Sequence, residues 1–305
     1  MYLLALSIGY AVPTGNFDAS VHSVFQSAIN LRLNGQDGLL TLIASSEGDL
    51  PQGIRLETPG GFSFEEFHAG ERVVCRDGIL HFENRSLIVQ LSTARRWQCN
   101  LTALEFDPSN PVISAAWTRV WEALNKRQRL NGSEIVAEDL LLLNSPARAG
   151  MSGRAGSAMR ELLHATRQYE STLPPAVNSL IGLGSGLTPS GDDLLVGYIT
   201  GLWCASRDKT ERLQFVSRLG KTIIDVLHKT NDISRTYLYH AVRGQVSSRL
   251  ANLAEGICRG AHLESLNETA EIAMSVGHTS GMETVSGLLL GLSAWEGNQL
   301  KNNLA

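Results

Sequence analysis

The sequence SGDDLLVGYITGLW, residues 190–203, combines a polar beginning with a long apolar run that contains two glycines four positions apart. The sequence SGMETVSGLLLGLSAW, residues 280–295, repeats this pattern ninety positions later, with glycines at the equivalent places. Both sequences carry an acidic residue in the expected first helical turn, where the helix dipole favours negative charge. They predict two similar helices, each with a stripe of small residues on one face.

Small residues would let the two helices approach closely, so that their N-termini and the loops before them open on one site. The alternative, which the sequence leaves open, is that Ser-Gly followed by an acidic residue is a common helix cap and that the glycines are packing spacers. A membrane dimer of the Gly-x-x-x-Gly type is not expected, because neither apolar run reaches the roughly 20 residues that cross a bilayer.

The loop before the first of these helices, GLGSGLTP at residues 182–189, is typical of an anion site. Glycines allow consecutive amide N–H groups to converge, and the N-terminus of the next helix adds a partial positive charge. The hydroxyls of Thr188 and Ser190 can donate to phosphate or carboxylate oxygens. Because the loop lacks the lysine of a Walker A motif, a simple nucleotide P-loop is not expected.

Carboxylates follow this loop directly. Asp192 and Asp193 are neighbours on the expected helix and cannot point the same way, so we expect one to face the site and the other to complement the helix dipole. The first could orient a substrate amide or hold a divalent cation, and Glu283 in the second helix could share that cation. Pure capping is the alternative for the two aspartates.

Two further residues could contact an anionic substrate. His278 lies in GHTSG, residues 277–281, where an imidazole could donate to a developing oxyanion or move a proton. Arg235 lies at an expected helix start, and a guanidinium binds a carboxylate or phosphate through two parallel hydrogen bonds. A structural histidine and an ordinary surface arginine are the alternatives.

These observations define a set of candidate site residues. The candidate catalytic residues are His278 and Asp192. The candidate substrate-binding residues are Gly184, Ser185, Gly186, Thr188, Ser190, Arg235, Thr279 and Ser280. The candidate metal ligands are Asp193 and Glu283, and Mg²⁺ is the cofactor that they could hold.

The N-terminal part of the chain has a different pattern, with short runs rich in β-branched and aromatic residues. Expected strands lie at residues 39–43, 72–75, 79–82 and 87–91, and the apolar residues 1–9 form core or strand rather than a signal peptide. Asp77-Gly78 is a strong signal for a two-residue hairpin, since both positions of a type I′ turn need positive φ. We expect an antiparallel sheet or a small barrel.

Beyond residue 110 the apolar residues recur at helical spacing, so the fold class is α+β, with a β-rich N-terminal half and an all-helical C-terminal half. The predicted division is a β-rich domain at 1–110, a helical connector at 111–155 and a helical domain at 156–305 that carries the glycine-rich loops. Helices are expected at 157–170, 192–206, 211–229, 233–256, 264–275 and 282–296.

Composition narrows the class of protein. The 305 residues carry a net charge of -4 with scattered Lys and Arg, so we expect neither a nucleic acid nor a membrane surface as partner. The four cysteines, Cys75, Cys99, Cys204 and Cys258, include no Cys-x-x-Cys pair and favour reduced thiols in a soluble, cytoplasmic protein.

The motif GSGLTPSGDD at residues 184–193, followed by GHTSG at 277–281, resembles one family. That family, long catalogued as a domain of unknown function, includes a subunit of oxamate carbamoyltransferase. The resemblance covers residues 175–296 and is looser in the N-terminal half. This chain departs from that subunit at Leu183 and Gly191, where the subunit carries a lysine and a histidine, and the departure puts the substrate in doubt.

The resemblance implies the last stage of anaerobic allantoin breakdown in purine catabolism. There, oxalurate and phosphate give oxamate and carbamoyl phosphate in a complex of three dissimilar subunits. It therefore implies a carbamoyltransferase subunit that binds a small anion, such as phosphate, carbamoyl phosphate or oxamate, and assembles with other subunits in a hetero-oligomer. The alternatives are a non-catalytic assembly or binding subunit, and a stand-alone Mg²⁺-dependent enzyme that acts on a small phosphorylated metabolite.

Overall fold

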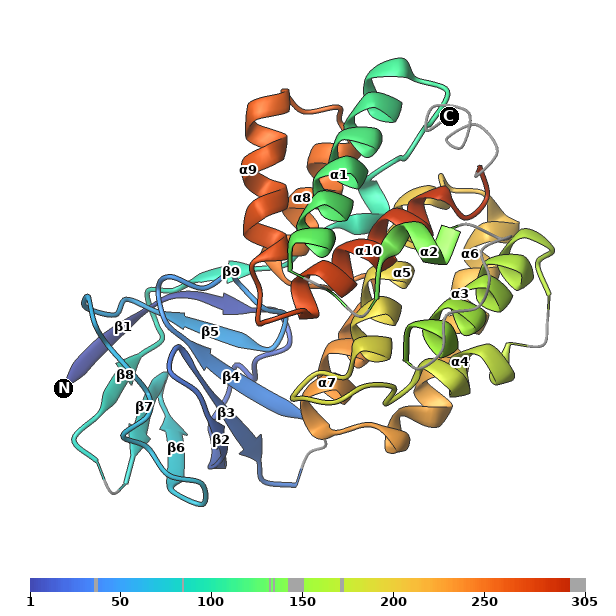
Figure 1. Ribbon diagram of the computed structural model, residues 1–305. Helices are drawn as coiled ribbons and strands as arrows, with labels where there is room; N and C mark the ends of the chain where they lie inside the picture. Colours follow the sequence, from blue (N-terminus) through green and yellow to red (C-terminus); the bar gives the residue numbers. More distant parts are fainter. Residues whose placement is uncertain are drawn as a thin grey trace. The chain divides into compact units, whose positions relative to one another are not determined.

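The computed structural model describes residues 1–35, 38–83, 85–131, 133, 135–141, 151–170 and 173–296. The chain forms two compact units, Met1–Cys99 and Asn100–Ala305 (Figure 1). The first unit is built from strands and the second from helices, which confirms the predicted α+β fold with its β-rich N-terminal and helical C-terminal halves.

The first unit is a closed barrel. Its strands are β1 (Tyr2–Gly9), β2 (Phe17–Val24), β3 (Ala28–Leu33), β4 (Leu39–Ile43), β5 (Gly53–Leu56), β6 (Arg72–Arg76), β7 (Ile79–Phe82), β8 (Ile88–Gln90) and β9 (Arg95–Trp97). They pair in the order β5-β4-β3-β2-β6-β7-β8-β1, and pairing of β1 with β5 closes the ring, while β9 adds to β1. Contacts of β1 with β8 and β9 and of β4 with β5 are parallel.

Local sequence chemistry explains the hairpin between β6 and β7. Asp77 and Gly78 have φ angles of 51° and 75°, as the predicted two-residue turn requires. Alternate strand residues then point into the barrel and form its core, because successive side chains of a strand face opposite sides. Fully buried core residues include Ile29, Leu31, Leu42, Ile54, Leu56, Val73, Leu80 and Val89.

The second unit is helical. Its helices are α1 (Pro111–Leu130), α2 (Ala137–Leu141), α3 (Met151–Arg167), α4 (Pro174–Leu180), α5 (Ser190–Ala205), α6 (Thr210–Val226), α7 (Asp232–Ala241), α8 (Ser248–Cys258), α9 (Leu263–Met274) and α10 (Ser280–Ser293), with short 3₁₀ turns η1 (Leu101–Ala103) and η2 (Leu227–Lys229). α5 and α10 are the most apolar of the longer helices, and nearly all of their residues are buried. They form the centre of this unit.

The predicted single helix at 233–256 is wrong in one respect. The structure has two helices there, α7 and α8, because Gly244 adopts a φ of +71° in the segment between them. A residue in the left-handed region ends a helix, and glycine adopts it without steric cost. Residues 142–150 of the predicted connector lie outside the described residues.

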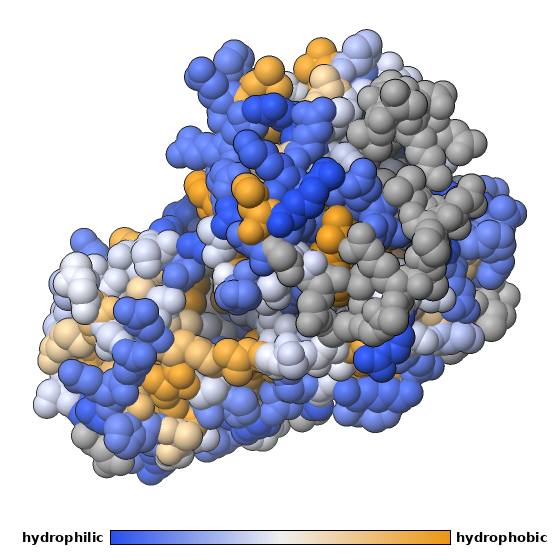
Figure 2. All heavy atoms as spheres, viewed as in Figure 1, coloured by the Kyte–Doolittle hydropathy of each residue, from blue (hydrophilic) through white to orange (hydrophobic). Residues whose placement is uncertain are grey.

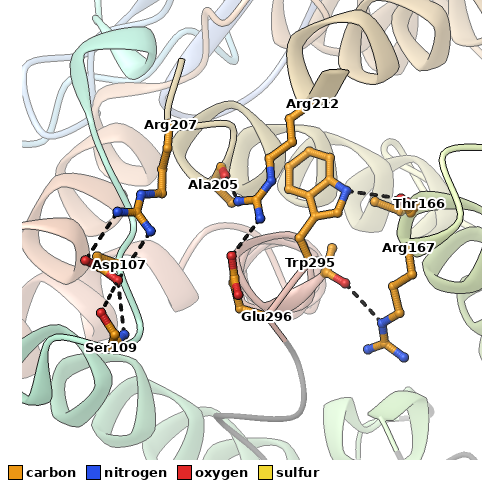
Figure 3. A network of polar contacts seen from close by, with 10 residues as sticks. Asp107, Ser109, Thr166, Arg167, Ala205, Arg207, Arg212, Trp295 and Glu296 are labelled. Carbon is orange, nitrogen blue, oxygen red and sulfur yellow. Dashed lines mark hydrogen bonds and ion pairs between the residues drawn. The ribbon is translucent and has the colours of Figure 1, made fainter. Parts of the chain in front are cut away.

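Polar contacts join the C-terminal end of the α5–α10 pair to its neighbours (Figure 3). The buried Arg212 guanidinium donates to the carbonyl oxygen of Ala205 at 2.7 Å and to Glu296 at 2.6 Å, and lies 4.8 Å from the ring centre of Trp295. The Trp295 indole donates to the carbonyl oxygen of Thr166. These contacts tie α10 to α3, α5 and α6.

Figure 2 shows hydrophilic side chains over much of the visible face of the helical unit, with single hydrophobic side chains between them. Among the described residues, none of the helices has both the length and the hydropathy needed to cross a membrane.

Candidate functional site

The site is positioned by direct backbone contact between α5 and α10. A Cβ atom on Gly197 would lie 1.9 Å from the carbonyl oxygen of Thr284, and one on Gly291 would lie 2.2 Å from that of Tyr198. Neither position accepts a side chain, so the glycines allow the two helices to touch. The two predicted stripes of small residues therefore face each other.

The contacts follow a local two-fold symmetry. Gly197 faces Thr284, and Gly287, its equivalent ninety residues later, faces Leu194, where a Cβ would lie 2.1 Å from the carbonyl oxygen. Leu194 is in turn the equivalent of Thr284. Each helix thus presents the same positions to the other, and both N-termini lie at the same end of the pair.

The two loops meet at that end. The Thr188 hydroxyl, in the glycine-rich loop before α5, lies 2.6 Å from the Ser280 hydroxyl at the start of α10. One turn further on, Asp193 and Glu283 are both buried, with exposed fractions of 7% and 5%. The structure therefore brings together four of the predicted site residues, two hydroxyls and two carboxyls.

A second negative charge on the buried carboxyl groups is unfavourable at this junction. Burial, and then the nearby charge of Glu283, raise the pKa of Asp193 well above its ordinary value, although the Ser280 and Thr188 hydroxyls favour its charged form. The Asp193 Oδ2 atom has no hydrogen-bond partner within the described parts of the chain. A proton or a cation would relieve the repulsion. The described residues contain no cluster of three or more metal-ligating His, Cys, Asp or Glu side chains.

Asp192 points elsewhere, as expected for a neighbour on the same helix. Its Oδ1 atom accepts a 2.8 Å hydrogen bond from the amide of Gly182, and its Oδ2 atom accepts one from the Thr230 hydroxyl. Burial raises the pKa of Asp192, while these two donors and the nearby Ser234 hydroxyl oppose that shift. The carboxylate therefore ties the start of the glycine-rich loop to the residue that follows η2.

Glycines shape the loop itself. Gly184 has a φ of +115°, and a Cβ there would lie 2.8 Å from the amide nitrogen of Ser190. At Gly191 a Cβ would lie 2.0 Å from the carbonyl oxygen of Leu180, so this backbone has no room for a side chain at that position. The Gly191 amide donates to the carbonyl oxygen of Leu183, and the Gly281 amide to that of Val276. These two amides hold the loops in shape.

The remaining predicted residues lie around the junction or beside it. Ser185 and Gly186 are exposed at the tip of the loop, His278 is exposed in the turn before α10, and Thr279 is half-buried. The Arg235 guanidinium lies 3.2 Å from Asp232 and donates to the carbonyl oxygen of Thr230 at 3.4 Å. Arg235 thus lies beside Thr230, whose hydroxyl binds Asp192, and no contact joins Arg235 to the loop junction among the described residues.

Thr230 is a site residue that the sequence does not reveal. It precedes the Asn231 cap of α7 and looks like part of a helix start, yet its hydroxyl holds a carboxylate 38 positions away in the chain. No spacing rule connects two such positions. Only the folded arrangement of α5 against α7 shows their relationship.

Two family models match the chain. The model described as "Oxamate carbamoyltransferase subunit AllH" matches residues 180–292, and the AllH family N-terminal domain matches residues 5–96. The chain belongs to the AllH family. This confirms the resemblance seen in the motifs and extends it to the barrel. No solved structure matches the chain significantly.

The AllH match contains every predicted site residue, from Gly184 to Glu283, and both helices of the symmetric pair. A surface hollow lies elsewhere in the helical unit, between the first half of α1 and Leu263 at the start of α9. None of the predicted site residues lines that hollow. In this AllH-family chain, the junction of the two loops therefore remains the candidate functional site.

Proposed function

We propose that this AllH-family chain is a subunit of a carbamoyltransferase and that it binds a small anionic substrate where the N-termini of α5 and α10 meet. The observation that carries the proposal is the 2.6 Å contact between the Thr188 and Ser280 hydroxyls, which joins the two loops. Two helix N-termini directed at one place favour an anion there. The description of the family model supports the type of reaction.

The reaction of the family is the conversion of oxalurate and phosphate to oxamate and carbamoyl phosphate. A phosphate oxygen attacks the ureido carbon, the bond from that carbon to the oxamate nitrogen breaks, and this nitrogen takes a proton. The loop hydroxyls and the main-chain atoms of Gly184, Ser185 and Gly186 would bind phosphate. Arg235 would bind the carboxylate, after exchanging its contact with Asp232, and His278 would donate a hydrogen bond to an oxygen of the bound anion.

The acidic pair has a specific place in this proposal. With both Asp193 and Glu283 ionised, the pair would repel a bound phosphate, so one proton or one Mg²⁺ ion has to accompany the anion. The Mg²⁺-dependent alternative rests on the same two carboxyl groups. Titration of the chain with Mg²⁺ in the presence and absence of phosphate shows whether a proton or Mg²⁺ accompanies the anion. Only a shared cation site makes Mg²⁺ and phosphate strengthen each other's binding.

Asp192 is proposed to act by positioning the loop. Both of its oxygens accept hydrogen bonds from the chain, one from Gly182 and one from Thr230, and only 1% of the residue is exposed. Removing the charge would release the loop start from η2. A catalytic contact of Asp192 with the substrate stays a prediction, and Asp192→Asn tests it, since a positioning role predicts weaker binding and a catalytic role predicts a lower kcat alone.

The test of the binding proposal is calorimetric titration of the purified chain with phosphate, carbamoyl phosphate and oxamate. We expect at least one ligand to bind, and Thr188→Ala, Ser280→Ala and His278→Ala to weaken that binding about tenfold or more. Thr269→Ala is the matched control, because among the described residues the Thr269 hydroxyl bonds only to a carbonyl of its own helix. Equal binding by Thr269→Ala and Thr188→Ala would contradict the proposed site.

The partners of the chain are proposed to be other subunits of a hetero-oligomer, as the word "subunit" in the family description suggests. An assembly role without catalysis is the second candidate. Reconstitution with the neighbouring subunits tests it: activity that survives in His278→Ala but requires the chain would favour assembly. A cytoplasmic location is part of the proposal, and the four cysteines, which are buried and form no disulfide, agree with reduced thiols.

A further inference from the structure

The two-fold symmetry of α5 and α10 relates two possible contacts between their loops, and only one of them is formed in the structure. Ninety positions separate Ser190 from Ser280 and Thr188 from His278. Thr188 contacts Ser280 across the symmetry axis at 2.6 Å. The symmetric contact would join His278 to Ser190, and no such contact is present among the described residues.

The backbone of the intervening residue explains the difference. Pro189 has φ and ψ of -56° and 140°, an extended conformation that directs Thr188 toward Ser280. Thr279, its equivalent, has φ and ψ of -125° and -22°. This turn leaves His278 exposed. Gly277, at a φ of +60°, and Thr279 flank His278, so a change at these two residues would move the imidazole. The hydrogen bond from the Gly281 amide to the Val276 carbonyl spans the same turn and has to re-form in the changed conformation.

The Ser190 hydroxyl is available for a ligand. Ser190 is 5% exposed, and its hydroxyl oxygen, which makes no hydrogen bond to another residue in the described parts of the chain, is not among the fully enclosed polar atoms. A Cβ on Gly184 would lie 3.1 Å from Ser190 Oγ and 2.8 Å from the Ser190 amide nitrogen, so only glycine lets the loop backbone approach this residue so closely. A nearly buried hydroxyl without a partner, next to a helix N-terminus, fits an oxyanion.

We propose that Ser190 and His278 act as a pair of donors that bind the same oxygen of the anionic substrate. On ligand binding, Thr279 adopts the extended conformation of Pro189, and His278 then lies opposite Ser190 as Thr188 lies opposite Ser280. The inference rests on the proposed function, because it assigns two donors to one oxyanion of that substrate, a phosphate or a carboxylate. A chain that keeps only one of these two side chains is expected to bind the anion little better than a chain that lacks both.

A double-mutant cycle with inorganic phosphate tests the pairing. Ser190→Ala and His278→Ala are each expected to weaken binding about tenfold, and the double variant to be only slightly weaker than either single variant. His262→Ala, which removes another exposed histidine, is the control. If the losses in phosphate affinity caused by the two single substitutions multiply in the double variant, the pairing is overturned.

Thr279→Pro tests the conformational step. Proline at 279 fixes the φ that Pro189 has and favours an extended His278 before it, and no backbone hydrogen bond is donated by Thr279 in the described structure. We expect about two- to fivefold tighter phosphate binding, and no gain when Ser190→Ala is also present. An equal gain with and without Ser190 would overturn the inference.

Nuclear magnetic resonance of the imidazole gives a readout that does not depend on turnover. Phosphate is expected to shift the His278 ring resonances in the wild-type chain and not in Ser190→Ala. If wild-type chain binds phosphate and the His278 shift persists in Ser190→Ala, the pairing is wrong while the proposed function stands. If neither phosphate, carbamoyl phosphate nor oxamate binds the wild-type chain, both are overturned.

Discussion

Gly197 of α5 rests directly on the backbone of Thr284 in α10, where a Cβ atom would lie 1.9 Å from the Thr284 carbonyl oxygen. The obstacle is main chain and cannot rotate away as a flexible side chain would. The relative position of the two loops, and with it the contact between Thr188 and Ser280, depends on this approach.

Gly197→Ala is therefore expected to destabilise the helical unit. One added methyl group has to separate two helices that touch over several turns, and overpacking of this kind costs about 1–3 kcal/mol. The helix propensity of alanine recovers at most about 1 kcal/mol of that loss. Urea unfolding followed by circular dichroism measures the change in the free energy of unfolding.

Gly256→Ala in α8 is the matched control. Its new methyl group would meet the side-chain atom Leu266 Cδ1 at 3.3 Å, a contact that a small rotation relieves. We expect this variant to be as stable as the wild type or more stable. If Gly197→Ala is no less stable than Gly256→Ala, the two helices do not touch as described.

Thr230→Val is expected to loosen the glycine-rich loop. Valine has nearly the same shape but cannot donate to the buried Asp192 carboxylate, and an unsatisfied buried acceptor costs about 1–3 kcal/mol. Phosphate binding should weaken too, and amide hydrogen exchange at residues 182–190 should quicken. Thr200→Val is the control, because within the described part of the chain the buried Thr200 hydroxyl donates only to a carbonyl of its own helix. Similar amide hydrogen exchange at residues 182–190 in Thr230→Val and Thr200→Val would show that the Thr230 hydrogen bond does not hold the loop.

Local chemistry explains which parts of this fold the sequence predicts. Asp77-Gly78 determines a turn by its own backbone preferences, and the glycine spacing of α5 and α10 marks two helices that pack closely. The acidic residues of their first turns identify the end at which the loops meet. This pattern predicts that the two loops approach each other, and the contact between Thr188 and Ser280 confirms it.

Long-range relationships escape such rules. The barrel closes through pairing of Ala5 with Leu56, and nothing in either strand specifies that partner. Asp192 and Asp193 are chemically identical in sequence, yet one is held by Gly182 and Thr230 and the other faces Glu283. Helix rotation distinguishes them, and rotation is set by packing. The glycine at 244 is visible in the sequence, but one glycine within a helical segment does not by itself predict that the helix ends there.

We predict that the buried His240 makes the helical unit less stable at low pH. Burial, and then the charge of Arg243, lower the pKa of His240 from 6.5 to about 4. The unfolded chain binds the proton more readily, so His240 contributes stability above pH 6.5 that is lost as the pH falls from 6.5 toward 4, on the order of 3 kcal/mol in total. His240→Gln should flatten this part of the stability profile, measured by urea unfolding at pH 4.5, 5.5 and 7. An unchanged slope would show that other groups cause it.

We predict that Arg212 stabilises the C-terminal end of the α5–α10 pair (Figure 3). Arg212→Met keeps the apolar stem but removes the donors to Ala205 and Glu296, and the cation over Trp295. Because Glu296 is 22% exposed, water can partly replace the lost partner, and we expect a loss of about 2 kcal/mol rather than the larger cost of a fully buried pair.

Arg218→Met and Arg212→Lys make this last prediction specific. Arg218 is exposed and lies 5.8 Å from the Phe215 ring, so its replacement should change the free energy of unfolding by no more than about 0.5 kcal/mol. Lysine at 212 keeps the charge but cannot contact Ala205 and Glu296 at once in the fork geometry of a guanidinium, and should lie between wild type and Arg212→Met. Full stability of Arg212→Lys would show that charge alone holds α10, whereas full stability of Arg212→Met would show that the C-terminal end of α10 is held by Trp295 and Thr166 without it.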